Sequence, residues 1–174
     1  MKKVLILHGW FATPKNDWYP WVKKQLELKG YDVFTPQLAD KDKPTFGRWK
    51  QCALRSSFLD KDTIVIGHSL GAILGLKLAE EYRFLKLITV SGWDFWDLTP
   101  EHKTFFKTLI NHKKIMKNVS KRVVIHSDND PFVTATIAEE FSKRLRAKFV
   151  LIPGKGHFIE KNGVVRFPEL LKYV

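Results

Sequence analysis

Short apolar runs alternate with longer amphipathic segments along most of this chain of 174 residues. The apolar runs are rich in Val and Ile and do not alternate strictly with polar residues, which is typical of strands buried on both faces. Parallel strands need a crossover segment between them, so this alternation predicts a parallel sheet with helices on both faces. The expected strands are residues 4–7, 33–35, 63–66, 85–90, 122–126 and 149–152.

The segments between these runs carry the expected helices. Gly30 follows the first of them and Pro44 precedes the second, in the positions where helices commonly end and begin. The sequence shows no internal repeat and no linker, so we expect a single domain over residues 1–174. The expected helices are residues 18–29, 45–58, 70–82, 100–117, 134–146 and 165–173.

The charge of the chain bears on its partners, and its cysteine content and apolar stretches bear on its location in the cell. Lys and Arg total 30 against 18 Asp and Glu, a formal charge of +12 that favours anionic partners in general. The densest basic run, residues 112–122, contains no aromatic residue for base stacking, so nucleic acid is not the expected partner. The lone Cys52 excludes an internal disulfide, and no apolar stretch approaches the roughly 18 residues of a membrane span. We therefore expect a cytoplasmic monomer without a membrane span.

A G-x-S-x-G pattern at Gly67, Ser69 and Gly71 lies between an apolar run and an amphipathic segment. A strand before this pattern and a helix after it are the context in which its serine is a nucleophile. The glycines allow strand and helix to approach closely at a sharp turn. We expect Ser69 to attack and the Leu70 N–H, at the helix start, to contact the oxyanion. The alternative is a glycine-rich turn with a capping serine.

A serine hydroxyl needs a base, and the base needs an orienting carboxylate. In this type of site the order along the chain is Ser, acid, His. His157, in a Gly-rich loop after the last apolar run, is the expected base. The preceding loop offers Asp128 and Asp130, and either could reach the imidazole. Pro131 restricts the backbone of Asp130 to extended conformations, whereas Asp128 could instead bond its own backbone in a turn.

The loop after the first apolar run is expected to supply the second oxyanion donor. Gly9 allows close backbone approach there, so we expect the Trp10 N–H to donate, with the Phe11 N–H as the alternative. His8 is expected to hold this loop by a side-chain hydrogen bond. Residues 91–106 are crowded with aromatic side chains and are a candidate lid or acyl-pocket wall, with ordinary helix packing as the alternative. The candidate pocket residues are Phe11, Trp93, Trp96, Phe132 and Phe158, with Phe105 and Phe106 from the aromatic segment.

Four motifs in order, HGW, GHSLGA, DNDPFV and GKGHF, span nearly the whole chain. Together they resemble the small serine hydrolases typified by retinoblastoma-binding protein 9 and the bacterial YdeN proteins. The resemblance implies a compact α/β-hydrolase fold with a six-stranded parallel sheet in the order 2-1-3-4-5-6 and little or no cap. It also implies that the acid is Asp130, directly before Pro-Phe, and not Asp128.

These observations predict a serine hydrolase that cleaves carboxylic esters. Ser69 would attack the acyl carbon, His157 would take and return the proton, and Asp130 would hold the imidazole. Amide cleavage, acyl transfer and a binding protein on the same fold remain open alternatives. The expected partner is a small ester or acyl substrate. No metal or cofactor is expected, because the sequence has no H-E-x-x-H, paired-cysteine, G-x-G-x-x-G or Walker pattern.

Overall fold

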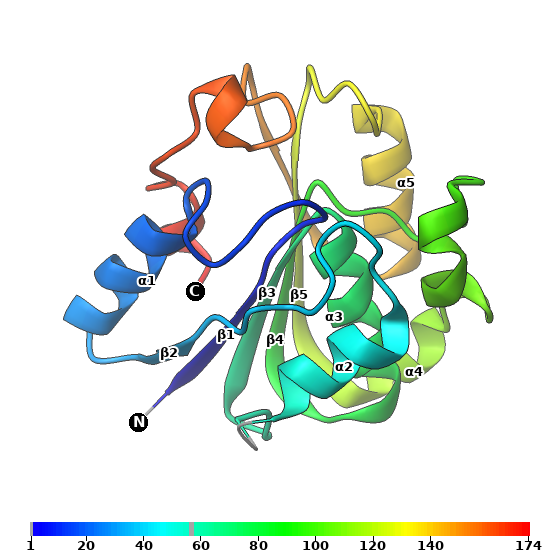
Figure 1. Cartoon of the computed structure of the whole chain (residues 1–174), viewed down its shortest axis with the longest axis horizontal. Coiled ribbons are helices and arrows are strands. Elements are labelled where there is room, and N and C mark those ends of the chain that lie inside the picture. The colour runs from blue at the N-terminus through cyan, green and yellow to red at the C-terminus, as the bar shows by residue number, and fades with distance from the viewer. Residues whose placement is uncertain (1, 56–57) are drawn as a thin grey trace.

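A parallel sheet forms the centre of the computed structural model, which describes residues 2–55 and 58–174. Its strands follow the order β2-β1-β3-β4-β5-β6 (Figure 1), which confirms the predicted fold class and strand order. The strands are β1 (Lys3–Leu7), β2 (Asp32–Phe34), β3 (Thr63–His68), β4 (Phe84–Val90), β5 (Val119–Ser127) and β6 (Lys148–Ile152).

Helices cover both faces of the sheet. α1 (Tyr19–Leu28) and the C-terminal segment lie on one face, and the remaining described α-helices lie on the opposite face (Figure 1). β1 serves both layers, because Val4 and Ile6 pack on the α1 side while Leu5 and Leu7 pack on the other. The helices are α1 (Tyr19–Leu28), α2 (Phe46–Leu54), α3 (Leu70–Glu81), α4 (His112–Asn118) and α5 (Ala135–Arg144).

Residues 100–117 do not form the single helix predicted from the sequence. A 3-10 helix covers Pro100–Phe106, and α4 begins only at His112. The Asn111 side chain accepts a hydrogen bond from the Lys114 N–H at 3.0 Å, which caps a new helix start and explains the break. The backbone between the two helices is held by the buried Lys77 ammonium, which donates to the Thr108 carbonyl at 2.9 Å.

The predicted last helix, residues 165–173, is also wrong. The segment instead holds a 3-10 turn at Leu170–Lys172, and a second turn at Glu160–Asn162 precedes it. Pro168 explains the difference, since it has no N–H to donate and disfavours a helical conformation in Phe167. The segment still covers the sheet, because Val164, Phe167 and Leu170 are buried against the α1 side.

The other predicted elements are present, with ends shifted by a few residues. The helix predicted over 45–58 ends at Leu54, and residues 56 and 57 of that range lie outside the described residues. In the part of the chain that the structure describes, no helix is both long and apolar enough to cross a bilayer. The loops that leave the carboxyl ends of β1, β3, β5 and β6 carry every residue predicted for catalysis.

Candidate active site

Ser69 lies between β3 and α3 in a conformation that non-glycine residues rarely adopt, with φ 53° and ψ −124°. The flanking glycines make this turn possible. A Cβ on Gly67 would lie 2.5 Å from the Gly71 carbonyl oxygen, and one on Gly71 would lie 2.5 Å from the His8 carbonyl oxygen. The start of α3 therefore approaches the end of β1 more closely than any side chain allows, and the strained turn projects Ser69 beyond the sheet.

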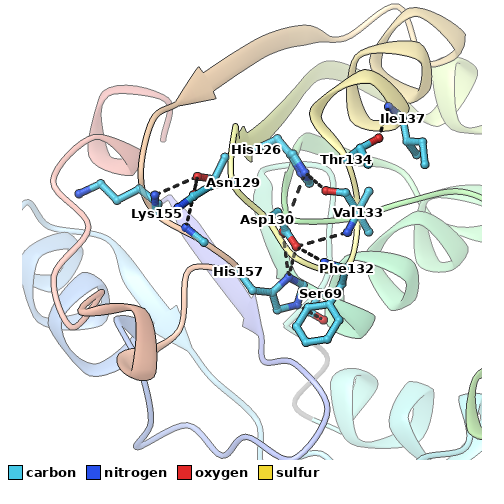
Figure 2. A network of polar contacts seen from close by, with 12 residues as sticks. Ser69, His126, Asn129, Asp130, Phe132, Val133, Thr134, Ile137, Lys155 and His157 are labelled. Carbon is cyan, nitrogen blue, oxygen red and sulfur yellow. Dashed lines mark hydrogen bonds and ion pairs between the residues drawn. The ribbon is translucent and has the colours of Figure 1, made fainter.

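The side chains of Ser69, His157 and Asp130 form one hydrogen-bonded row (Figure 2). His157 Nε2 lies 2.8 Å from Ser69 Oγ, and His157 Nδ1 lies 2.9 Å from Asp130 Oδ2. An ionised carboxylate can only accept hydrogen bonds. His157 Nδ1 therefore carries a proton and donates a hydrogen bond to Asp130. In the neutral ring Nε2 is then the acceptor for the serine hydroxyl. Of the two aspartates, Asp130 is the one that lies beside the imidazole.

The Asp130 carboxylate is buried, and both of its oxygens accept hydrogen bonds. Oδ1 accepts the Phe132 N–H at 2.9 Å and the Val133 N–H at 3.3 Å, in addition to His157. Burial alone would raise the pKa of Asp130, but the hydrogen bonds and charge of His157 outweigh it and lower the pKa from its ordinary value. The group is therefore a carboxylate throughout the neutral range.

Asp128 and Asn129 connect the two catalytic loops instead of contacting the imidazole. Asp128 Oδ1 accepts the Gly154 N–H at 2.8 Å, and Asn129 Oδ1 accepts the Gly156 N–H at 2.7 Å. Figure 2 shows Asn129 beside the loop that leads to His157. These contacts set the distance between the loops that carry Asp130 and His157.

Two backbone N–H groups next to Ser69 are free. Those of Trp10 and Leu70 have no acceptor within residues 2–55 and 58–174, whereas the Phe11 N–H donates to the Lys41 carbonyl at 3.3 Å. A Cβ on Gly9 would lie 3.2 Å from the Ser69 Cβ, so the loop after β1 passes directly beside the serine. The arrangement favours Trp10 over Phe11 as a partner of Leu70.

Sequence reasoning missed a chain of polar contacts beneath this site. The Gly9 N–H donates to the Tyr19 hydroxyl at 3.1 Å, and that hydroxyl donates to His68 Nδ1 at 2.5 Å. His68 Nε2 donates to the His157 carbonyl at 2.8 Å. The loop beside Ser69 is thereby connected to the backbone of His157. His8, as expected, holds its own loop, with Nδ1 2.9 Å from the Gly9 carbonyl.

His68 is buried and neutral in this chain of contacts. Burial, with the nearby His157 adding to it, lowers the pKa of His68 to about 3. A neutral ring is what the contacts require, because one nitrogen accepts from Tyr19 while the other donates to the His157 carbonyl. The only sequence signal for this role was the position of His68 directly before the nucleophile.

We expect His68 to carry a single ring proton, on Nε2, at pH 5. The unfolded chain protonates this ring near pH 6.5, while the folded chain does so near pH 3. The unfolded state binds more protons between these values, so lowering the pH through this window reduces the free energy of unfolding, by up to about 1.4 kcal/mol per pH unit from this group. Nitrogen-15 NMR of the imidazoles checks the assignment, and a doubly protonated His68 at pH 5 would contradict it.

A cavity of about 540 Å³ opens beside the serine. Ser69 and His157 line it, together with Phe11, Trp93 and Phe132 from the predicted pocket. Phe11 and Phe132 are largely exposed, so they form its outer rim, whereas Trp93 is buried in its wall. An apolar cavity next to a nucleophile can hold the non-reacting part of an acyl substrate.

The structure does not place the other candidate pocket residues at this cavity. Phe158 is fully buried on the α1 side, with its ring centroid 5.0 Å from that of Phe167, so its predicted role as a pocket residue is not retained. Trp96 lies outside the cavity lining, and its indole N–H donates to the Thr99 carbonyl at 3.1 Å. Phe105 belongs to the core on the α3 side, and the partly buried Phe106 packs against that core. Sequence proximity to a catalytic loop did not indicate on which side of the backbone these rings lie.

The segment after β4 is anchored by a buried carboxylate. Asp94 accepts two hydrogen bonds from Arg144, each at 2.7 Å, and lies 2.8 Å from His112 Nε2. Asp94 and its two partners do not line the cavity themselves. No group of three or more His, Cys, Asp or Glu side chains in the described part of the chain is arranged to hold a metal ion.

The model of the serine hydrolase family matches residues 4–174. YdeN of Bacillus subtilis is 28% identical over 175 residues, which cover 96% of this chain and 91% of that protein. Serine hydrolase RBBP9 of Rattus norvegicus is 30% identical over 162 residues, 91% of this chain and 85% of that protein. The crystal structure of the Bacillus subtilis YdeN gene product matches with a TM-score of 0.89 at 26% identity, covering 99% of this chain and 96% of that one.

More distant structures share the fold. An esterase domain from a Rhodothermus marinus protein matches with a TM-score of 0.74 at 17% identity, covering 99% of this chain and 85% of that one. The family match extends over nearly the entire chain and agrees with the four sequence motifs. The chain therefore belongs to the serine hydrolase family.

Proposed function

We propose that this protein hydrolyses carboxylic esters through an acyl-enzyme formed on Ser69. The observation that carries the proposal is the hydrogen-bonded row from Ser69 through His157 to Asp130, with the serine at the wall of an apolar cavity. Family membership supports hydrolysis, and the shared fold of an esterase domain is compatible with an ester as substrate.

In the first half of the reaction, Ser69 Oγ attacks the acyl carbon while His157 Nε2 takes the hydroxyl proton. Asp130 then faces a doubly protonated imidazole and stabilises its positive charge. As the tetrahedral intermediate collapses, His157 donates the proton to the leaving alcohol. In the second half, water loses a proton to His157 and attacks the acyl-serine. His157 then returns that proton to Ser69 Oγ as the acid leaves, which restores the free enzyme.

The negative oxygen of the tetrahedral intermediate needs donors that are already in place. In the proposed mechanism the N–H groups of Trp10 and Leu70 supply them. Leu70 directly follows Ser69, Trp10 lies in the loop that passes beside it, and neither N–H has an acceptor in the described residues. Each such donor contributes on the order of a hundredfold to a thousandfold in rate.

The charge at the cavity favours a neutral substrate over an anionic one. Asp17 and Asp97 line the cavity, and no Lys or Arg is among its described lining residues. The formal charge of +12 is therefore not directed at this site. Burial raises the pKa of Asp17 from its ordinary value.

We further propose that the chain acts as a monomer and a single domain in the cytoplasm. One continuous sheet with a core on each face supports the single domain. The buried, unpaired Cys52 is compatible with a reducing compartment.

A fluorophosphonate probe and a p-nitrophenyl ester series of increasing acyl length test this function together. We expect the probe to label the wild type and the Ser120→Ala variant but not Ser69→Ala, with ester turnover following the same pattern. Ser120 is the matched control, because it lies at the opposite end of the sheet, where it bonds the Leu85 carbonyl. Turnover that survives in Ser69→Ala would refute the mechanism. Faster turnover of the matching p-nitroanilides would indicate that the substrate is an amide and not an ester.

A further inference from the structure

A second aspartate–histidine pair lies in the wall of the same cavity. His102 Nδ1 is 3.0 Å from both Oδ1 and Oδ2 of Asp97, and both residues line the cavity with Ser69. The proposed reaction uses neither of them. A buried histidine that faces a binding cavity and has no catalytic step to perform is a candidate for substrate recognition.

The His102 ring is held rigidly. It is only 7% exposed and contacts two tryptophans, with ring centroids 5.1 Å from Trp10 and 5.4 Å from Trp93. Asp97 fixes the rotation of the ring from one end. A buried ring that contacts two aromatic side chains and is bonded at one nitrogen presents its other nitrogen in one direction, which is the property of a preorganised binding group.

The pairing also fixes which nitrogen carries the proton. The Asp97 carboxylate only accepts, so Nδ1 is the donor and Nε2 of the neutral ring is an acceptor. Nε2 has no hydrogen-bond partner among the described residues and is not one of the fully covered unpaired atoms. By contrast, the unpaired indole nitrogens of Trp10 and Trp93 are covered and present no surface to a ligand.

We propose that His102 binds a hydroxyl group of the substrate through Nε2, at a point remote from the scissile ester. This assignment rests on the proposed function, because it places the acyl or alcohol part of the ester in the cavity beside Ser69. The ester itself has no donor for Nε2, so the donor must come from another group on the substrate.

The surroundings favour a neutral hydroxyl over a charged donor or an anion. A substrate carboxylate would face the negative charge of Asp97. An ammonium group would need a free carboxylate beside His102, but the Asp97 oxygens already accept from His102 and from the Thr99 N–H at 3.2 Å. A charge without a partner is costly in such a place, while a hydroxyl needs only the one acceptor that is free.

Three matched series of p-nitrophenyl esters test this inference. The acyl chains are linear and end in a hydroxyl, a methoxy or a methyl group, because methoxy accepts hydrogen bonds but cannot donate them. At the chain length that reaches His102, we expect the hydroxyl ester to exceed the other two in kcat/KM by on the order of tenfold. The His102→Phe variant should reduce this preference to within about twofold while still hydrolysing the methyl-terminated esters.

His112→Phe is the matched control, because His112 is also paired with an aspartate, Asp94, but does not line the cavity. It should retain the hydroxyl preference. Asp97→Asn provides a second variant if His102→Phe does not fold. The Asn amide can donate to Nδ1, which moves the ring proton to Nε2, and the discrimination against methoxy should then fall.

The outcomes separate this inference from the function on which it rests. If no ester is hydrolysed and the fluorophosphonate leaves Ser69 unlabelled, the proposed function fails. If the wild type hydrolyses methyl-terminated esters but prefers a hydroxyl at no chain length, only the role of His102 is refuted. A preference that persists in His102→Phe, or an ammonium-terminated ester that exceeds the hydroxyl ester, would refute it equally.

Discussion

Asp130→Asn should lower kcat for ester hydrolysis by about 10⁴-fold while leaving the fold intact. The carboxylate accepts a hydrogen bond from His157 Nδ1 at 2.9 Å, and this contact keeps Nε2 free to accept from Ser69. An asparagine amide can donate at the same position, so the imidazole would carry its proton on Nε2 and could no longer take one from the serine. Steady-state kinetics with a p-nitrophenyl ester measure the loss.

Asp128→Asn is the control for this substitution, since it makes the same chemical change two residues away. Its side-chain oxygen can still accept the Gly154 N–H, the contact that Asp128 makes now. We expect kcat to stay within about twofold of the wild type, because no proton of the reaction passes through Asp128. If the Asp128 variant lost turnover while the Asp130 variant kept it, the assignment of the acid would be reversed.

The parts of the site that the sequence predicted are those encoded by local chain geometry. A turn that few other sequences can form is predicted by Gly67, Ser69 and Gly71. The strand before it and the helix after it are predicted by the hydrophobic pattern alone. His157 was found by its loop and its order in the chain. Between Asp128 and Asp130 the residues alone left both open, and only the resemblance to known hydrolases favoured the one that the structure brings to His157.

The features that the sequence did not predict depend on contacts between distant segments. Tyr19 and His68 are 49 residues apart, and their bond exists only because α1 packs beside the end of β3. Phe158 directly follows His157 and Phe132 lies two residues after Asp130, yet Phe158 is buried in the core and Phe132 forms the cavity rim. The sequence pattern does not determine such a choice, because it depends on the direction in which the loop leaves its strand.

Gly71→Ala should lower the free energy of unfolding by about 3 kcal/mol, the upper end of the usual cost of overpacking. The added Cβ would meet the backbone carbonyls of Leu7 and His8, the latter at 2.5 Å. Neither can move without displacing the end of β1, which pairs with β3 through Leu7 and Gly67. Urea denaturation measures this change in the free energy of unfolding as a shift of the unfolding midpoint, with the slope of the free energy against urea concentration unchanged.

Gly47→Ala makes the same chemical change within α2, where an added Cβ would meet no atom within 4 Å. It should stabilise the protein by about 0.5–1 kcal/mol, because alanine loses less backbone freedom than glycine in a helix. The two variants should therefore shift the unfolding midpoint in opposite directions. Because the close approach at Gly71 also positions Ser69, its alanine variant should react slowly with a fluorophosphonate even below the urea concentration at which it unfolds. A Gly71→Ala protein as stable and as reactive as the wild type would show that the turn at Ser69 does not need this contact between α3 and β1.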